Sequence, residues 1–382
     1  MMKKLGSFIK AIIFVSLVFL SPYSAYCFDT PEYSVGQRNV ILDLPNKFAL
    51  VEDTGSRLSF AFGESGVYFQ IKFQTEPFSS VASLGESTIK KMGGTGEGTW
   101  FSYKENPAWF GSFTFGHGGT EYSSYILTIQ QDSSAFVMVS FCPTDLVNQY
   151  NDILVSAIDS FAFAGTDNSY YGPLGAFDRY FADTSTTPYS TQIEGSVITA
   201  NLQKGFTESE DFAIQREARI LNADGTVTGW KRFYRMIFKD MYPDLLPLAQ
   251  AFERSPLFSA DDISLAVSLL SYVQGFSYSR AGTLSDLHPG LTSVFDSTGD
   301  CDTRSLVYLS LLHYFDIKGI LLVSTVYMHG LAAIDVEKTG AGYVLDGKKY
   351  IIAETTEKVD LGLIASDMAD PANWIPVELW ER

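Results

Sequence analysis

The chain has 382 residues, 46% of them hydrophobic and 19% charged, so it is long enough for two or three domains and apolar enough for packed cores. Its formal net charge of −17 at pH 7 repels phosphate backbones, which argues against nucleic acid as a partner. Three cysteines and four scattered histidines do not make a zinc site, and we expect no metal and no other cofactor.

The first 27 residues have the pattern of a secretory signal. Lysines precede an apolar stretch that runs through Leu20, and small residues lie near its end. We expect cleavage after Cys27 and an exported protein, periplasmic or extracellular. Acylation of Cys27 is the alternative, which the bulky Tyr26 disfavours. No later stretch reaches the about 20 apolar residues that span a bilayer, so we expect no transmembrane span in the mature chain.

Residues 28–165 predict an N-terminal α+β domain. Short runs rich in β-branched and aromatic residues, from NVILDLP to AFVMVSFC, alternate with Gly, Asn and Asp turns, which indicates an antiparallel sheet. Segments 79–92 and 144–161 are patterned as helices. This order, which closes in a helix and DSFAF, resembles the PsbP/Mog1-like family. We expect any cell-envelope partner to bind through this domain.

The Gly-, Ser- and Thr-rich segment 166–190 predicts a linker, and residues 191–382 predict a second α+β domain. Segments 194–205 and 212–238 are interpreted as strands, with Asp224 and Gly225 in a hairpin turn. Helices follow, one beginning at Pro243, one ending near Gly275 and one beginning at Cys301. Four strand-like runs complete the chain.

Removal of the signal segment would leave Cys142 and Cys301, which could form a disulfide in an oxidising compartment. Because Cys142 ends a strand-like run in the other domain, the alternative is a small buried hydrophobic side chain. Cys301 stands in GDCDTRS at the start of an apolar helix. The helix dipole and free backbone N–H groups there favour a thiolate, whereas Asp300 and Asp302 oppose it. This position indicates a nucleophile.

A nucleophilic thiol needs a base to take its proton, and the chain has only four histidines that could serve. His313 lies three turns down the same helix, roughly 18 Å from the cysteine at about 1.5 Å per residue, and cannot serve. His329 opens a strand after one helix, a turn and another strand, which is enough chain to return to the helix start. Asp335, Asp346 and Glu354 are candidates to orient it, and Glu354 comes level with His329 if its strand runs back beside that of His329.

Four segments, YVQGFSYSR, GDCDTRS, HGLAAIDV and YIIAETT, resemble in order the catalytic core of the transglutaminase-like superfamily. The resemblance implies a papain-like α+β core. It also implies a catalytic triad of Cys301, His329 and Glu354.

By the same resemblance, Gln274 lines the cleft and helps to stabilise an oxyanion, and Tyr278 is a second candidate of this kind. The sequence departs from the family pattern at Leu331, where many members have tryptophan, and at Glu354, where aspartate is usual.

Two functions follow from these residues. The first is an exported thiol enzyme, a cysteine peptidase, amidase or acyltransferase that attacks amide bonds of a protein or peptide. Hydrolysis is favoured over transamidation because the sequence shows no feature that binds an amine. The alternative is a cell-envelope binding or assembly protein that keeps this fold with little or no catalysis, as the two acids beside Cys301 would allow.

Overall fold

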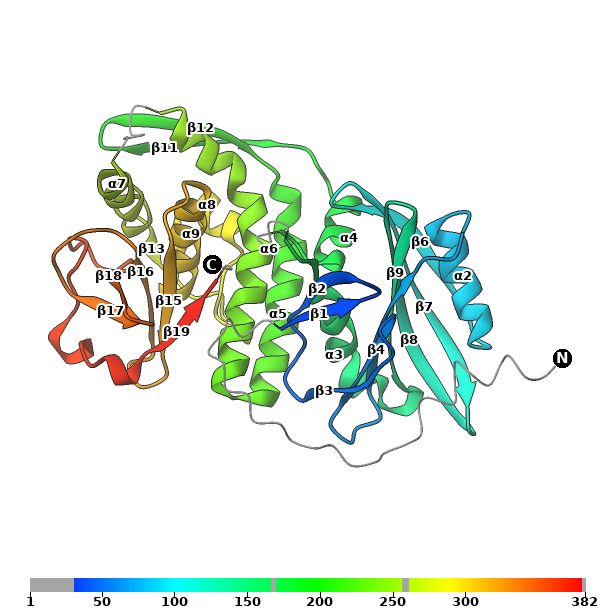
Figure 1. The fold of residues 1–382 in the computed structure, drawn as a ribbon. Helices are drawn as coiled ribbons and strands as arrows, with labels where there is room; N and C mark the ends of the chain where they lie inside the picture. Colours follow the sequence, from blue (N-terminus) through cyan, green and yellow to red (C-terminus); the bar gives the residue numbers. More distant parts are fainter. Residues whose placement is uncertain (1–30, 166–169, 256–260, 380–382) are drawn as a thin grey trace.

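The computed structural model describes residues 31–165, 170–255 and 261–379 and shows a mixed α+β architecture with several antiparallel sheets (Figure 1). Eight α-helices lie in these ranges. None of the helices described there has the length and apolar character needed to cross a membrane. The predicted signal segment 1–27 lies outside the described residues.

A seven-stranded antiparallel sheet forms most of the N-terminal half, as the alternating pattern predicted. Its strand order is β3-β4-β5-β9-β8-β7-β6. The strands are β3 (Phe48–Asp53), β4 (Arg57–Phe62), β5 (Tyr68–Gln74), β6 (Thr95–Tyr103), β7 (Asn106–His117), β8 (Thr120–Gln131) and β9 (Ser134–Pro143). The helices α2 (Val81–Lys91) and α3 (Val147–Asp159) bury their apolar sides on the sheet.

A small sheet of β1 (Glu32–Val35), β2 (Arg38–Leu42) and β10 (Phe161–Phe163) adjoins the large one. The predicted linker contains α4 (Pro173–Phe181), and residues 166–169 lie outside the described ranges. Tyr171, Leu174 and Ala176 are buried in the N-terminal core. This segment is therefore packed structure over most of its length.

The strand interpretation of residues 212–238 is wrong. The segment forms α5 (Thr207–Asp224) and α6 (Val227–Glu253). Gly225 ends α5 with φ 63°, a left-handed cap that glycine adopts without strain, rather than turning a hairpin. Pro243 and Pro247 both lie inside α6, so the helix expected to begin at Pro243 begins four turns earlier. The other predicted strand is present, in the hairpin of β11 (Thr187–Ile193) and β12 (Ser196–Leu202).

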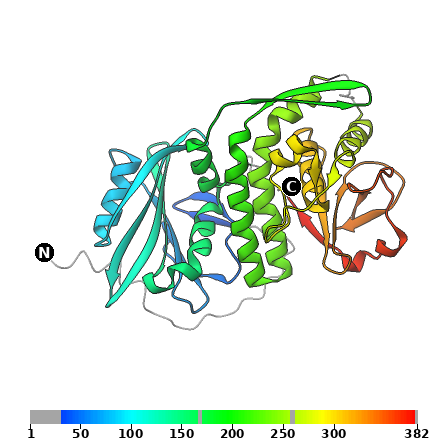
Figure 2. The ribbon, with the colours of Figure 1, turned by 180° about the vertical axis from the view of Figure 1, so that it is seen from behind.

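Both views place α5 and α6 between the large sheet and the C-terminal elements (Figures 1 and 2). Buried ion pairs join these helices to the N-terminal half. Arg216 Nη2 lies 2.5 Å from Asp159 Oδ2, and Arg235 Nη2 lies 2.8 Å from Asp43 Oδ1. Because buried charges are costly unless paired, separating the two halves would leave these groups without their partners at a high cost in free energy.

The C-terminal half packs helices against a five-stranded sheet of order β17-β18-β16-β15-β19. Its helices are α7 (Asp262–Gln274), α8 (Gly290–Asp296) and α9 (Cys301–Tyr314). The strands of this sheet are β15 (Gly319–Ser324), β16 (His329–Ile334), β17 (Gly342–Leu345), β18 (Lys348–Ala353) and β19 (Ile375–Glu378). A separate parallel pair is formed by β13 (Ser277–Tyr278) and β14 (Thr298–Gly299). The 3-10 turns are η2 (Thr144–Leu146), η3 (Lys204–Phe206), η4 (Ser366–Met368) and η5 (Pro371–Asn373). The helix α9 is buried along its length, as its apolar sequence predicted.

Candidate active site

Cys301 is the first residue of α9 and is 7% exposed. Asp300 caps the helix, since its Oδ1 accepts hydrogen bonds from the backbone N and the hydroxyl of Thr303 at 2.8 and 2.5 Å. The backbone N–H of Gly330 donates to the Cys301 sulfur. The thiol itself donates to Asp302 Oδ1 at 3.4 Å. The cysteine thus lies where the start of α9 meets the start of β16.

Asp302 connects three elements at this point. Tyr234 of α6 donates its hydroxyl to Asp302 Oδ2 at 2.6 Å. The other carboxylate oxygen rests against Gly330 so closely that a Cβ there would lie 1.9 Å from it. Gly330 therefore leaves the space in which Asp302 sits beside the thiol.

His329 and Glu354 are in direct contact, with Nε2 2.8 Å from Oε2. The antiparallel register of β16 and β18 pairs Ala332 with Ala353, which brings the next residue, Glu354, toward the start of β16. Thr356 donates its backbone N–H and its hydroxyl to Glu354 Oε1 at 2.8 and 2.6 Å. Burial alone would raise the pKa of Glu354, but the bonds and charge of His329 and the Thr356 bonds outweigh it and lower that pKa. Glu354 is thus an ionised partner that holds Nε2 and leaves Nδ1 of His329 for another contact.

The cysteine and the histidine are neighbours through Gly330, which follows His329 in the chain and donates to Cys301. Within the ranges that the structure describes, the thiol bonds to Asp302 and no hydrogen bond joins it to the imidazole. The structure therefore gathers Cys301, His329 and Glu354 at one place. Their catalytic roles stay a prediction.

The thiol environment does not favour a resting thiolate. Burial, followed by the negative charges of Asp302 and Asp300, raises the pKa of Cys301 well above its ordinary value, and the Gly330 hydrogen bond opposes this only in part. Burial and the charge of Asp302 also raise the pKa of Asp300 to about 7. These surroundings favour the protonated thiol over the thiolate at neutral pH.

The same three residues have the spacing of metal ligands. The sulfur of Cys301 and one carboxylate oxygen each of Asp300 and Asp302 lie within 4.8 Å of one another. Both carboxylates already accept protein hydrogen bonds, from Thr303 and Tyr234. We therefore interpret the cluster as the polar surroundings of the thiol.

Gln274 lies near Glu354, and its side-chain amide already makes hydrogen bonds. Its Nε2 donates to the carbonyl oxygens of Glu354 and Val359 at 2.8 and 2.9 Å. These bonds use both amide hydrogens and fix the turn that follows β18. The oxyanion role predicted for Gln274 is untested and would require one of these bonds to break.

Tyr278 lies beside the short strand β14, which leads to Cys301. The parallel pairing of β13 with β14 sets Tyr278 opposite Gly299, two residues before Cys301. Its side chain is 55% exposed, and the Arg304 guanidinium carbon lies 5.7 Å from its ring centroid. Tyr278 therefore borders the site, and a role toward an oxyanion stays a prediction.

Arg304 is a site residue that the sequence did not reveal. It is 1% exposed and donates to the carbonyl oxygens of Gly299 at 3.0 Å and Thr355 at 3.4 Å. Arg304 thereby links Gly299, two residues before Cys301, to Thr355, the residue after Glu354. Arginine one turn into an otherwise apolar helix was the available signal, because a buried guanidinium must bond to something nearby.

The thiol of Cys142 lies apart from this site. Both cysteines of the described residues are buried and free, so the alternative of a disulfide between them is not realised. Burial raises the pKa of Cys142 to about 11. It behaves as a small buried hydrophobic side chain.

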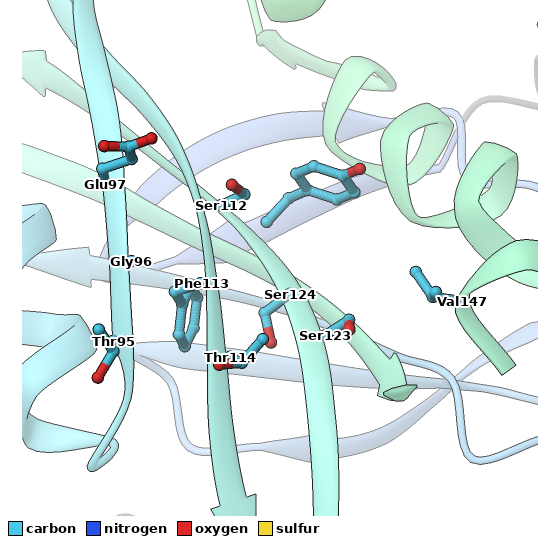
Figure 3. A pocket seen from close by; sticks show the side chains of 10 residues that line it. Thr95, Gly96, Glu97, Ser112, Phe113, Thr114, Ser123, Ser124 and Val147 are labelled. Atoms are coloured by element: carbon cyan, nitrogen blue, oxygen red, sulfur yellow. The ribbon is translucent and has the colours of Figure 1, made fainter. Parts of the chain in front are cut away.

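A cavity of about 590 Å³ lies elsewhere, in the N-terminal half. Figure 3 shows Glu97, Ser112 and Ser123 on three neighbouring strands, with Val147 facing them from α3. The strand register aligns Glu97 with Ser112, and Thr95 with Thr114 and Ser123. The lining contains hydroxyls and one carboxylate but no cysteine or histidine.

Comparison with known proteins gives only distant similarities. No protein-family model matches the chain, and no curated protein matches it. A solved structure of cyanobacterial PsbP from Synechocystis matches with 9% identity, a TM-score of 0.31, and coverage of 38% of this chain and 98% of that one. LpqN of Mycobacterium tuberculosis, described as involved in cell envelope biogenesis, matches with 10% identity, a TM-score of 0.23, and coverage of 36% and 86%.

A further solved structure, from Bacteroides thetaiotaomicron, covers 57% of this chain and 78% of its own with 8% identity and a TM-score of 0.27. The chain is thus distantly similar to PsbP-like and LpqN-like domains, and these values carry no conclusion about function. The comparisons give no support to the transglutaminase-like resemblance.

Proposed function

We propose that the protein is an exported, transglutaminase-like thiol enzyme that cleaves amide bonds of a protein or peptide. The observation that carries the proposal is the His329–Glu354 contact of 2.8 Å, located one residue from the backbone N–H that donates to Cys301. A buried nucleophile, a basic ring and a carboxylate that fixes one ring nitrogen are the components of thiol acyl transfer.

Because the resting thiol is protonated, we propose general-base attack rather than a preformed thiolate. His329 Nδ1 takes the thiol proton as sulfur bonds to the carbonyl carbon. The imidazolium then gives that proton to the amine as the C–N bond breaks, which leaves a thioester on Cys301. Water adds to the thioester, its proton passes through His329 to the departing sulfur, and the products are a carboxylic acid and the free thiol. Glu354 stabilises the imidazolium at each step.

The test is acylation by p-nitrophenyl acetate, followed by intact mass and peptide mapping. We expect a burst of p-nitrophenolate and an acetyl adduct on the peptide that contains Cys301. Cys301→Ser and His329→Ala should each lose the burst, whereas Cys142→Ser should keep it. Acetylation of Cys301 at an undiminished rate in His329→Ala would refute the triad.

A cell-envelope binding or assembly role is the second candidate. It is supported by the thiol itself, which bonds to Asp302 and whose pKa is raised. On this proposal, p-nitrophenyl acetate forms no acyl adduct on Cys301 at any pH between 6 and 9, while the chain still folds and binds a cell-envelope partner through its N-terminal cavity.

A further inference from the structure

The segment after β13 is held against the loop of the nucleophile. Ser279 donates its backbone N–H to the carbonyl oxygen of Gly299 at 3.2 Å, which continues the β13–β14 pairing by one residue. Arg280 comes next, and the backbone N–H of Ala281 donates to Asp286 O at 3.0 Å, which closes the loop that follows. The backbone of Arg280 is thus fixed beside the residues that lead into Cys301.

The side chain of Arg280 is only loosely engaged. Its Nε lies 3.4 Å from the Tyr278 hydroxyl, and its Nη1 lies 3.5 Å from Asp286 Oδ2, with the arginine side chain 54% exposed. Exposed pairs at such distances contribute little. A guanidinium has five N–H donors, so Arg280 retains capacity to bind a planar anion.

Arg280 places a positive charge near Cys301 in a chain whose formal net charge is −17. Arg280 acts electrostatically on both Cys301 and Asp302. Arg304, which also lies beside the motif, is buried and bonded to backbone carbonyls. Among the arginines of the described residues next to Cys301, Arg280 is therefore the one placed to meet a ligand from solvent.

We propose that Arg280 is a specificity residue that binds a carboxylate on the acyl part of the substrate, close to the bond that Cys301 attacks. This inference rests on the proposed function. The substrate class is a peptide whose acyl residue carries a carboxylate, either on its side chain or as a free terminus. Paired N–H donors of a guanidinium match the two oxygens of a carboxylate, and the exposed Tyr278 ring supplies a flat surface beside them.

Two alkylating probes test the proposal in a Cys142→Ser background. Iodoacetate and iodoacetamide form the same S–C bond with loss of iodide and differ only in bearing a carboxylate or a neutral amide. At pH 8.5 and low salt, we expect Arg280→Gln to lower the ratio of their rates at Cys301 by about three- to fivefold, as one charge pair near 4 Å in water gives. Arg280→Lys should keep part of the preference, and 0.5 M salt should remove it.

Arg38→Gln is the matched control, because Arg38 is also an exposed arginine paired with an aspartate. Its ratio should equal that of the wild type. An unchanged ratio in Arg280→Gln overturns the inference. So does an equal change in both rates, because that would show an effect on the thiol alone. Failure of the proposed function has a different signature, since acylation of Cys301 would then be the same in His329→Ala as in the wild type, while Arg280→Gln would still lower the iodoacetate-to-iodoacetamide ratio.

Discussion

Replacing Asp302 by asparagine should make the Cys301 thiol more acidic. In the wild type the carboxylate lies 3.4 Å from the sulfur and raises the pKa of the thiol. Asparagine keeps a similar shape and an oxygen that can accept the thiol hydrogen bond, but it removes the negative charge that opposes a thiolate.

The size of the effect follows from Coulomb's law. Two charges at this separation repel by about 1 kcal/mol in bulk water and by about 5 kcal/mol at an effective dielectric constant near 20. Since one pKa unit corresponds to about 1.4 kcal/mol, we expect the pKa of Cys301 to fall by at least about one unit. Burial raises the pKa of Asp302 itself, so the difference should appear only at pH values where Asp302 is ionised.

The assay is the pH dependence of the rate of iodoacetamide labelling at Cys301, measured from pH 6 to pH 10 in a Cys142→Ser background. Asp262→Asn is the control, because Asp262 also lies in the first turn of a helix but belongs to α7. A profile for Asp302→Asn that coincides with the wild type, or lies at higher pH, would refute the electrostatic reasoning.

Three further changes have defined outcomes. Glu354→Gln should lower the rate of acylation by p-nitrophenyl acetate by about 100-fold or more, because the imidazolium loses its carboxylate. The pKa of Glu354 is lowered in the folded protein from its ordinary value of 4.5. The ionised carboxylate therefore stabilises the fold above pH 4.5, and this stabilisation is lost as the pH falls through the lowered pKa. The melting temperature of Glu354→Gln should lack this pH dependence. Gly330→Ala should displace Asp302 and lower the melting temperature, since the new Cβ would lie 1.9 Å from Oδ1. Asp43→Ala should cost about 3 to 5 kcal/mol in urea unfolding, because it leaves the buried Arg235 without its acid.

Matched variants separate these effects from general damage. Gly116→Ala introduces a Cβ with no heavy atom within 4 Å and should leave the melt unchanged. Asp132→Ala breaks the exposed pair with Arg38 and should cost at most about 1 kcal/mol. Equal losses in Asp43→Ala and Asp132→Ala would show that burial of the ion pair does not matter. A melt of Gly330→Ala equal to that of Gly116→Ala would mean that the site has room that the structure does not show.

The contact between His329 and Glu354 was predictable because local signals fix the intervening chain. Asp346 and Gly347 both have positive φ, 50° and 79°, so the Asp-Gly pair turns the hairpin between β17 and β18 as expected. The strand that follows then returns toward the start of β16. A turn of this kind can be predicted from the sequence because it depends on only a few adjacent residues.

Helix α5 and the first part of α6 were missed because their buried faces carry charges. Arg216, Glu217 and Arg232 are almost fully buried yet polar, since each lies in an ion pair. An amphipathic pattern counts such positions as solvent-facing, so the helical period is obscured. The surroundings of the thiol were unpredictable for a related reason, because Tyr234 reaches Asp302 from the part of α6 that the sequence pattern had indicated as a strand.

The buried ion pairs between the halves also limit how this protein can be divided. Arg216, Arg232 and Arg235 have acceptors on the N-terminal side of residue 165, namely Asp159, Ser156 and Asp43. A fragment beginning at residue 191 would keep all three guanidinium groups and lose these partners. The C-terminal portion is therefore a poor candidate for expression by itself, and its chemistry is best studied in the intact chain.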